Sequence, residues 1–184
     1  MSSNPGRPPA GGRNATEAAI RWPAAFEPSR SPVHVRNEIE IAASAGRVWA
    51  WLVRAERWPE WYANSRDVRF LAGRPPDLAP GTRFRWRTFG VRISSRVLEF
   101  EPPHRLAWDA RGIGVLAYHA WLVQESPGGC RVLTEETQRG WLARLGARLM
   151  PARMWRGHQL WLESLRERAP AGAPDRVEPP GPIG

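Results

Sequence analysis

Alternating apolar and polar positions fill the middle of the chain and predict a series of β-strands. In the segment 35–41 the apolar residues share one face and charged residues occupy the other, which is the pattern of a half-buried strand. The segment 82–89 alternates in the same way and sets Phe84 and Trp86 opposite arginines. Further strands are predicted at 68–71, 91–100, 105–110, 115–124 and 130–138, with Gly- and Pro-containing loops between them.

Two short helical segments follow the first predicted strand. Ser44 can cap a helix that runs to Leu52, because a serine in this position accepts a hydrogen bond from the first helical turn. Pro59 suits the start of a second short helical turn. The chain therefore begins its folded part with a strand and two short helices.

The closing segment, 141–168, carries two apolar stripes that lie on nearly opposite sides of an ideal helix. Pro151 stands between them and removes a backbone donor, so a bend or break is predicted there. The C-terminal piece should face the sheet with His158 near the middle of its stripe. The stripes are Leu142, Leu145 and Leu149, and then Met154, His158, Trp161, Leu162 and Leu165.

Several short segments occur in an order that matches a known family. They are 38–44, 47–49, 58–61, 81–84, 97–103, 105–108, 119–122 and 128–132, followed by Glu135, Glu136 and the closing helix. Through them the chain resembles the START-like superfamily, also called SRPBCC, of polyketide cyclase/dehydrase-like and lipid-transfer-like proteins. The resemblance implies an α+β helix-grip fold. In this fold a curved antiparallel sheet of six or seven strands wraps around a long C-terminal helix and encloses a hydrophobic cavity. It implies no catalytic set, because the superfamily has none in common.

Composition sets the limits of the folded domain. Residues 1–32 are rich in Pro and Gly and are expected to be a disordered tail, as are residues 170–184. The domain itself is expected at 33–169. Cys130 is the one cysteine, which excludes an internal disulfide and a cysteine-based zinc cluster. The sequence has no apolar run suited to a signal peptide or a membrane span, so a cytoplasmic protein is expected.

The charge is strongly positive, with a formal net charge of +9, and every basic residue is arginine. A turn at Gly90 would bring Arg92 and Arg96 beside the arginines of 83–87, which is unfavourable unless an anion or an acidic side chain intervenes. An anionic membrane or a nucleic acid could supply that anion; a solvated outer face is the alternative. The Trp- and Arg-rich stretch 139–156 could likewise rest on a bilayer or pack on the sheet.

His119 and Glu136 are the candidate catalytic residues. His119 shares a strand face with Trp121 and could hydrogen-bond a ligand or move a proton, or it could be a structural histidine of the core. Glu136 on a neighbouring strand is its best polar partner, and a surface salt bridge is the alternative for this glutamate. The four histidines show no metal-ligand spacing with Cys, Asp or Glu, so neither metal nor cofactor is expected.

Tryptophans on separate strands could form an aromatic wall for a flat ligand, although core packing explains them equally well. Met154 and His158 on the closing helix would be the facing wall. The full set of candidate ligand-binding residues is Trp86, Trp108, His119, Trp121, Glu136, Met154 and His158.

These observations favour binding of a hydrophobic small molecule, lipid-like or polycyclic, by a carrier or a sensor. The second hypothesis is an enzyme of the polyketide cyclase, aromatase or dehydratase type that uses the same cavity. The third, which ranks last because no nucleic-acid motif is present, is a basic module for anionic membranes or nucleic acid. The sequence does not indicate an oligomeric state.

Overall fold

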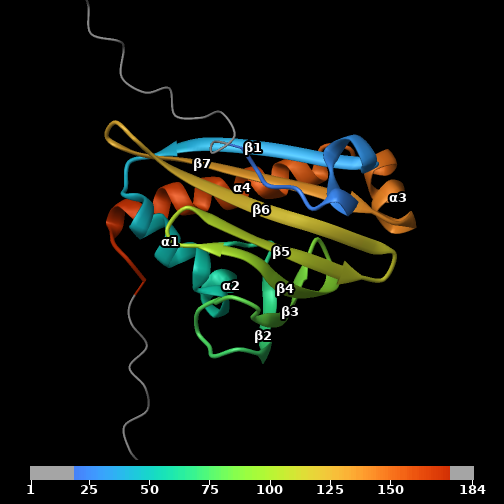
Figure 1. Ribbon diagram of the computed structural model, residues 1–184, viewed down its shortest axis with the longest axis horizontal. Helices are drawn as coiled ribbons and strands as arrows, with labels where there is room; N and C mark the ends of the chain where they lie inside the picture. Colours follow the sequence, from blue (N-terminus) through green and yellow to red (C-terminus); the bar gives the residue numbers. More distant parts are fainter. Residues whose placement is uncertain (1–18, 175–184) are drawn as a thin grey trace, which may run out of the picture.

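The computed structural model describes residues 19–174 and shows a curved antiparallel sheet around a long closing helix (Figure 1). The seven strands lie in the order β1-β7-β6-β5-β4-β3-β2, so consecutive strands are neighbours except where β1 closes against β7. The strands are β1 Val33–Ile41, β2 Arg66–Ala72, β3 Arg83–Thr88, β4 Val91–Glu101, β5 Arg105–Gly112, β6 Val115–Ser126 and β7 Gly129–Arg139. The expected curved antiparallel sheet of six or seven strands is confirmed.

Two short helices connect β1 to β2, as the sequence predicts. The first, α1, spans Ala45–Val53, and the Ser44 side chain accepts a hydrogen bond from the Arg47 backbone N–H at 3.4 Å. The second, α2, spans Trp58–Trp61 and has proline in its first turn. Together with the sheet and the closing helix, they make the helix-grip fold.

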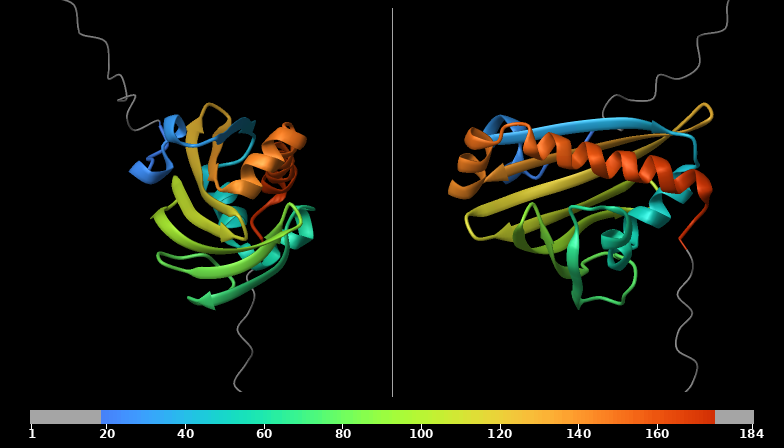
Figure 2. Two further views of the ribbon diagram at one scale, coloured as in Figure 1. Left: turned by 90° about the vertical axis from the view of Figure 1, so that its right-hand side faces the viewer. Right: turned by 180° about the vertical axis from the view of Figure 1, so that it is seen from behind.

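The closing segment is two helices, which confirms the break predicted at Pro151. The first, α3, spans Trp141–Leu149, and the second, α4, spans Arg153–Arg168. The back view in Figure 2 shows α4 running alongside β1, and α3 lies at the end of the sheet. The two apolar stripes differ in burial. His158 and Trp161 of α4 are buried, whereas Leu145 and Leu149 of α3 are 45% and 66% exposed.

Tryptophans fill a large part of the interior. Trp58 of α2 and Trp161 of α4 are buried with their ring centroids 5.1 Å apart, and Trp86 lies 5.3 Å from Trp58. Trp121 packs edge-on against Trp161 at 5.0 Å. The expected hollow is therefore reduced to the part of the interior that this aromatic cluster leaves open.

A segment before β1 covers part of the sheet's other face. Ile20 and Phe26 are buried there against Tyr118 and neighbouring residues, and the left view of Figure 2 shows the segment on the side of the sheet opposite α4. The predicted tail of residues 1–32 thus overlaps a segment that packs on the sheet, because its few large apolar side chains find an apolar surface. Residues 1–18 and 175–184 lie outside the described residues. No helix within 19–174 is long and apolar enough to cross a membrane.

The arginines of β3 and β4 gather on the exposed outer face of the sheet. Arg83 lies opposite Arg96, and Arg87 lies opposite Arg92, as the turn at Gly90 predicts. Asp67 forms an ion pair with Arg87 at 3.4 Å.

Candidate functional site

A cavity of about 160 Å³ lies between the concave face of the sheet and the two closing helices. Trp86 and Trp108 line it from the sheet, and Leu142, Gly146 and Met150 line it from α3 and its C-terminal end. The lining is mostly apolar, so the cavity suits an apolar guest.

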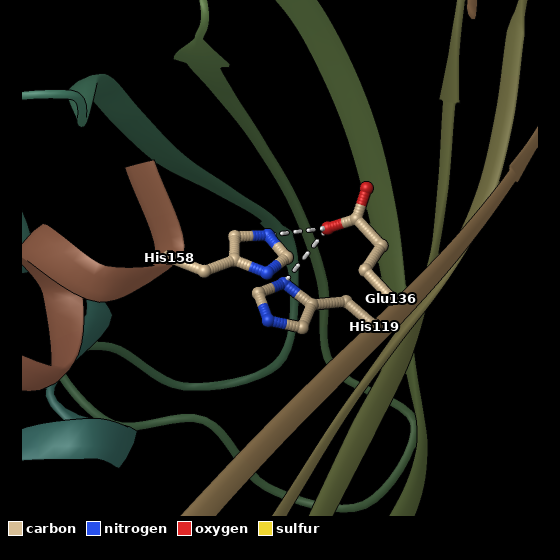
Figure 3. Close-up of side chains that lie close together, drawn as sticks. All are labelled: His119, Glu136 and His158. Carbon is tan, nitrogen blue, oxygen red and sulfur yellow. Dashed lines mark ion pairs between the residues drawn. The ribbon is translucent and has the colours of Figure 1, made fainter. Parts of the chain in front are cut away.

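Three of the titratable side chains that line this cavity lie close together: His119, Glu136 and His158 (Figure 3). His119 Nδ1 lies 3.2 Å from Glu136 Oε2, and His158 Nε2 lies 3.3 Å from the same oxygen. The two imidazole rings are stacked, with centroids 4.7 Å apart and planes inclined by 10°. The side chains of the two histidines are only 2% and 1% exposed, and that of Glu136 is 10% exposed.

The sheet register explains how two of these residues meet. His119 on β6 pairs directly with Glu136 on β7, and residues directly opposite in an antiparallel pair point to the same face. His158 comes from α4, whose buried stripe also carries Trp161 and Leu162. Since α4 crosses the concave face, it brings His158 to the strand pair.

Hydrogen bonds hold the outer sides of this cluster. His119 Nε2 lies 2.7 Å from Thr134 Oγ1, and Thr134 Oγ1 donates to the Ala120 carbonyl oxygen at 3.2 Å. Gln138 Nε2 donates to Glu136 Oε1 at 2.6 Å. His158 has no hydrogen bond from either ring nitrogen to any described residue.

Burial sets the charges of the cluster. It lowers the pKa of His119 to about 3, and the nearby Glu136 carboxylate only partly offsets this. Burial alone would raise the pKa of Glu136, but contacts with His158, His119 and Gln138 hold it below its usual range. At neutral pH the cluster therefore holds a carboxylate next to a neutral His119.

Six of the seven candidate ligand-binding residues line the cavity. They are Trp86, Trp108, His119, Glu136, Met154 and His158. Trp121 does not line it, because its ring packs between His119 and Trp161. The proposed pairing of His119 with Glu136 is present in the structure, while the roles of both residues in binding or catalysis stay predictions.

The sequence reasoning missed Gln138 and Trp161 as lining residues. Gln138 follows Glu136 by two positions on β7, so strand alternation would have placed it on the same face. Trp161 was assigned to the buried stripe of α4 and not to a cavity wall. The indole N–H groups of Trp108 and Trp161 have no hydrogen-bond partner among the described residues, which leaves two donors on cavity-lining side chains.

Comparisons with known proteins agree with the fold. Residues 32–170 match the family described as polyketide cyclase/dehydrase and lipid transport. A hypothetical protein from Helicobacter pylori is 33% identical with a TM-score of 0.77, covering 82% of this chain and 96% of that one. No curated protein matches.

Two more distant solved structures share the fold. A protein from Thermus thermophilus is 22% identical with a TM-score of 0.64, and the match covers 76% of this chain and 98% of that one. The di-domain aromatase/cyclase BexL from the BE-7585A biosynthetic pathway is 19% identical with a TM-score of 0.60, covering 74% of this chain and 50% of that one. The family match covers the whole domain from β1 to α4, and the chain therefore belongs to the polyketide cyclase/dehydrase and lipid transport family of the START-like superfamily.

Proposed function

We propose that this protein binds a hydrophobic small molecule that carries one polar group, as a carrier or a sensor. The observation that carries the proposal is an apolar cavity with a buried His–Glu–His cluster in its wall. Removal of apolar ligand surface from water supplies affinity, and a few polar groups in an apolar pocket set the orientation.

The size of the cavity limits the part of the guest that it encloses. An apolar cavity of about 150 Å³ holds one benzene molecule, and the cavity here has about 160 Å³. One aromatic ring or a short acyl chain fits inside. A polycyclic guest would extend out of the cavity, which is partly open to solvent.

The polar group of the guest is expected at Glu136 and His158. The Glu136 carboxylate accepts hydrogen bonds, and His158 has no hydrogen bond to the described residues that a guest would have to displace. The indole N–H groups of Trp108 and Trp161 are further donors for a guest oxygen. A phenol-like hydroxyl or a carbonyl would satisfy such groups, which are costly to leave unpaired in an apolar interior.

The test compares two guests that differ by one hydroxyl, 4-fluorophenol and fluorobenzene, by ¹⁹F NMR titration. Both should bind, and 4-fluorophenol should bind about tenfold more tightly, because one hydrogen bond to a charged group contributes about 1.5 kcal/mol or more. Glu136→Gln should reduce that preference, whereas Glu135→Gln on the same strand should leave it unchanged. Absence of binding by either guest to folded protein would refute the proposal. Native mass spectrometry of protein from its own host would identify a retained compound.

An enzyme of the cyclase, aromatase or dehydratase type is the second candidate function. BexL, a di-domain aromatase/cyclase, is among its structural neighbours, and a histidine next to a carboxylate can move a proton. Under this hypothesis His119→Ala and His158→Ala would abolish turnover of a polyketide-like substrate while 4-fluorophenol still binds. Unchanged turnover in both variants would remove the pair from any acid–base role.

Contact with an anionic membrane is a third candidate, favoured by the outer face of α3. Trp141, Leu145 and Leu149 are exposed there beside the exposed Arg144 and Arg148, a combination typical of helices that lie on anionic bilayers. Co-sedimentation with phosphatidylglycerol vesicles should exceed that with phosphatidylcholine vesicles and fall with salt.

The α3 variant Trp141→Ser/Leu149→Ser should lose this vesicle binding. Arg83→Ala/Arg85→Ala/Arg87→Ala, on the outer face of the sheet, is its control. If only the triple arginine variant loses binding, the contact surface is the arginine face. Binding of duplex DNA by wild type but not by that variant would favour the nucleic-acid alternative.

A further inference from the structure

Three possible metal-ligand atoms converge in the wall of the cavity. One ligand atom from each of His119, Glu136 and His158 lies within 4.8 Å of the other two, and all three residues are buried. They come from β6, β7 and α4, so no local sequence spacing reveals them. We propose that they bind one divalent transition-metal ion of the Zn²⁺ type and leave a coordination position open to the cavity.

The two nitrogen–oxygen distances fit the coordination shell of such an ion. Zinc binds histidine nitrogen and carboxylate oxygen at about 2.0–2.2 Å in tetrahedral sites, which sets neighbouring ligand atoms about 3.3–3.6 Å apart. The Glu136 oxygen lies 3.2 Å from His119 Nδ1 and 3.3 Å from His158 Nε2. Two histidines and one glutamate are a ligand set that zinc uses when the fourth position is held by water or a guest.

One tautomer of His119 presents a free lone pair to Glu136. Thr134 Oγ1 lies 3.2 Å from the Ala120 carbonyl oxygen and 2.7 Å from His119 Nε2; when its one hydroxyl proton is donated to the carbonyl, it accepts a hydrogen bond from His119 Nε2–H. In a neutral imidazole this leaves the Nδ1 lone pair facing the Glu136 carboxylate at 3.2 Å. Two electron-rich atoms repel at that distance, and a cation between them would be coordinated by both.

His158 is the third proposed ligand. Neither ring nitrogen of His158 has a hydrogen bond to the described residues, although the side chain is 1% exposed. Nε2 lies 3.3 Å from Glu136 Oε2, so coordination through Nε2 would place the ion between the two atoms. The His158 ring is stacked on that of His119, with centroids 4.7 Å apart and planes inclined by 10°, so it must tilt out of the stack for Nε2 and His119 Nδ1 to face one ion.

The outer partners are those expected around a metal site. The second nitrogen of His119 is held by Thr134, and the second oxygen of Glu136 is held by Gln138. Such contacts orient the ligands and leave one donor atom of each for the ion. An ion held there could coordinate a guest oxygen, but metal binding needs no guest and stands apart from the proposed function.

The test uses the full chain after EDTA treatment. Calorimetry with Zn²⁺ should give one ion per chain, and Co²⁺ should produce the visible absorption bands of a four- or five-coordinate site. His158→Gln should weaken binding about 100-fold, and Thr134→Val about tenfold, because loss of an outer-shell partner costs 10- to 100-fold in affinity.

A matched control is available on the other face of the sheet. His34 Nε2 contacts Glu135 Oε2 at 2.7 Å on β1 and β7, so His34→Gln removes another His–Glu pair without touching the cluster. Folded wild type that binds neither ion overturns the proposal, as does equal loss of binding in His34→Gln and His158→Gln. Metal-free protein that binds 4-fluorophenol but not Zn²⁺ would refute this inference alone. Protein that binds Zn²⁺ but neither fluorinated guest would refute the proposed function alone.

Discussion

Gly146 offers a way to fill the cavity without disturbing its walls. It lies within α3 and lines the cavity, and a Cβ added there would meet no atom within 4 Å. Gly146→Leu therefore places an apolar side chain in the space that the guest would occupy. A benzene-sized guest buries on the order of 100 Å² of apolar surface, or about 2.5 kcal/mol. Exclusion of that guest should weaken fluorobenzene binding about 70-fold.

The same substitutions separate occlusion from any effect on folding. Gly146→Ala should keep fluorobenzene binding and raise the free energy of unfolding by about 0.5–1 kcal/mol, because glycine is disfavoured inside a helix. Gly46→Ala in α1, where an added Cβ also meets nothing within 4 Å, is the control for helix propensity alone. ¹⁹F NMR titration and urea unfolding measure the two effects. Unchanged fluorobenzene binding in folded Gly146→Leu would refute the position of the guest.

Three further predictions concern stability. Trp161→Ala should lower the free energy of unfolding, measured in urea, by about 3–5 kcal/mol, because it empties the centre of the aromatic cluster. Trp155→Ala, at an exposed position, should change it by about 0.5 kcal/mol or less. Similar losses in the two variants would contradict the packing. Gly157→Ala should destabilise the protein, unlike Gly146→Ala, because its Cβ would overlap the Phe89 ring; equal melting temperatures for Gly157→Ala and wild type would contradict this. His119 has a pKa of about 3 in the folded protein and about 6.5 in the unfolded chain. As pH falls, its imidazole is therefore protonated in the unfolded chain before it is protonated in the folded protein. The contribution of neutral His119 to the free energy of unfolding is fully present above about pH 6.5, and the free energy of unfolding should drop by about 2 kcal/mol between pH 7.5 and 5.0. In urea unfolding with EDTA present, the free energy of unfolding of His119→Gln should drop less over this pH range than that of wild type. The same pH dependence in both proteins would contradict the role of His119.

The positions of the strands, the faces they bury and the helix break could be read from local patterns. Alternation places Phe84 and Trp86 inside and the arginines outside because a strand repeats every two residues. Pro151 predicts the break because proline lacks the donor that a continuous helix needs. The pairing of His119 with Glu136 also followed from alternation, once both strands were assumed to be neighbours.

Local sequence patterns do not show which side chains fill the interior and which line the cavity. Alternation says which face of β6 Trp121 occupies, but the position of Trp161 on α4 decides whether that face meets a cavity or another ring. The third member of the cluster, His158, depends on how α4 crosses the sheet. The burial of Phe26 likewise depends on an apolar patch formed by three strands. Each of these is a long-range contact that no short segment encodes.

A crystal structure of the protein soaked with 4-bromophenol tests the central claim most directly. Anomalous scattering locates the bromine without reference to the protein coordinates. We expect a bromine peak within the cavity between Trp86, Trp108 and α3, with the phenol oxygen in hydrogen-bond distance of Glu136 or His158. An interior closed by side chains, or a bromine bound only at the surface, would contradict it.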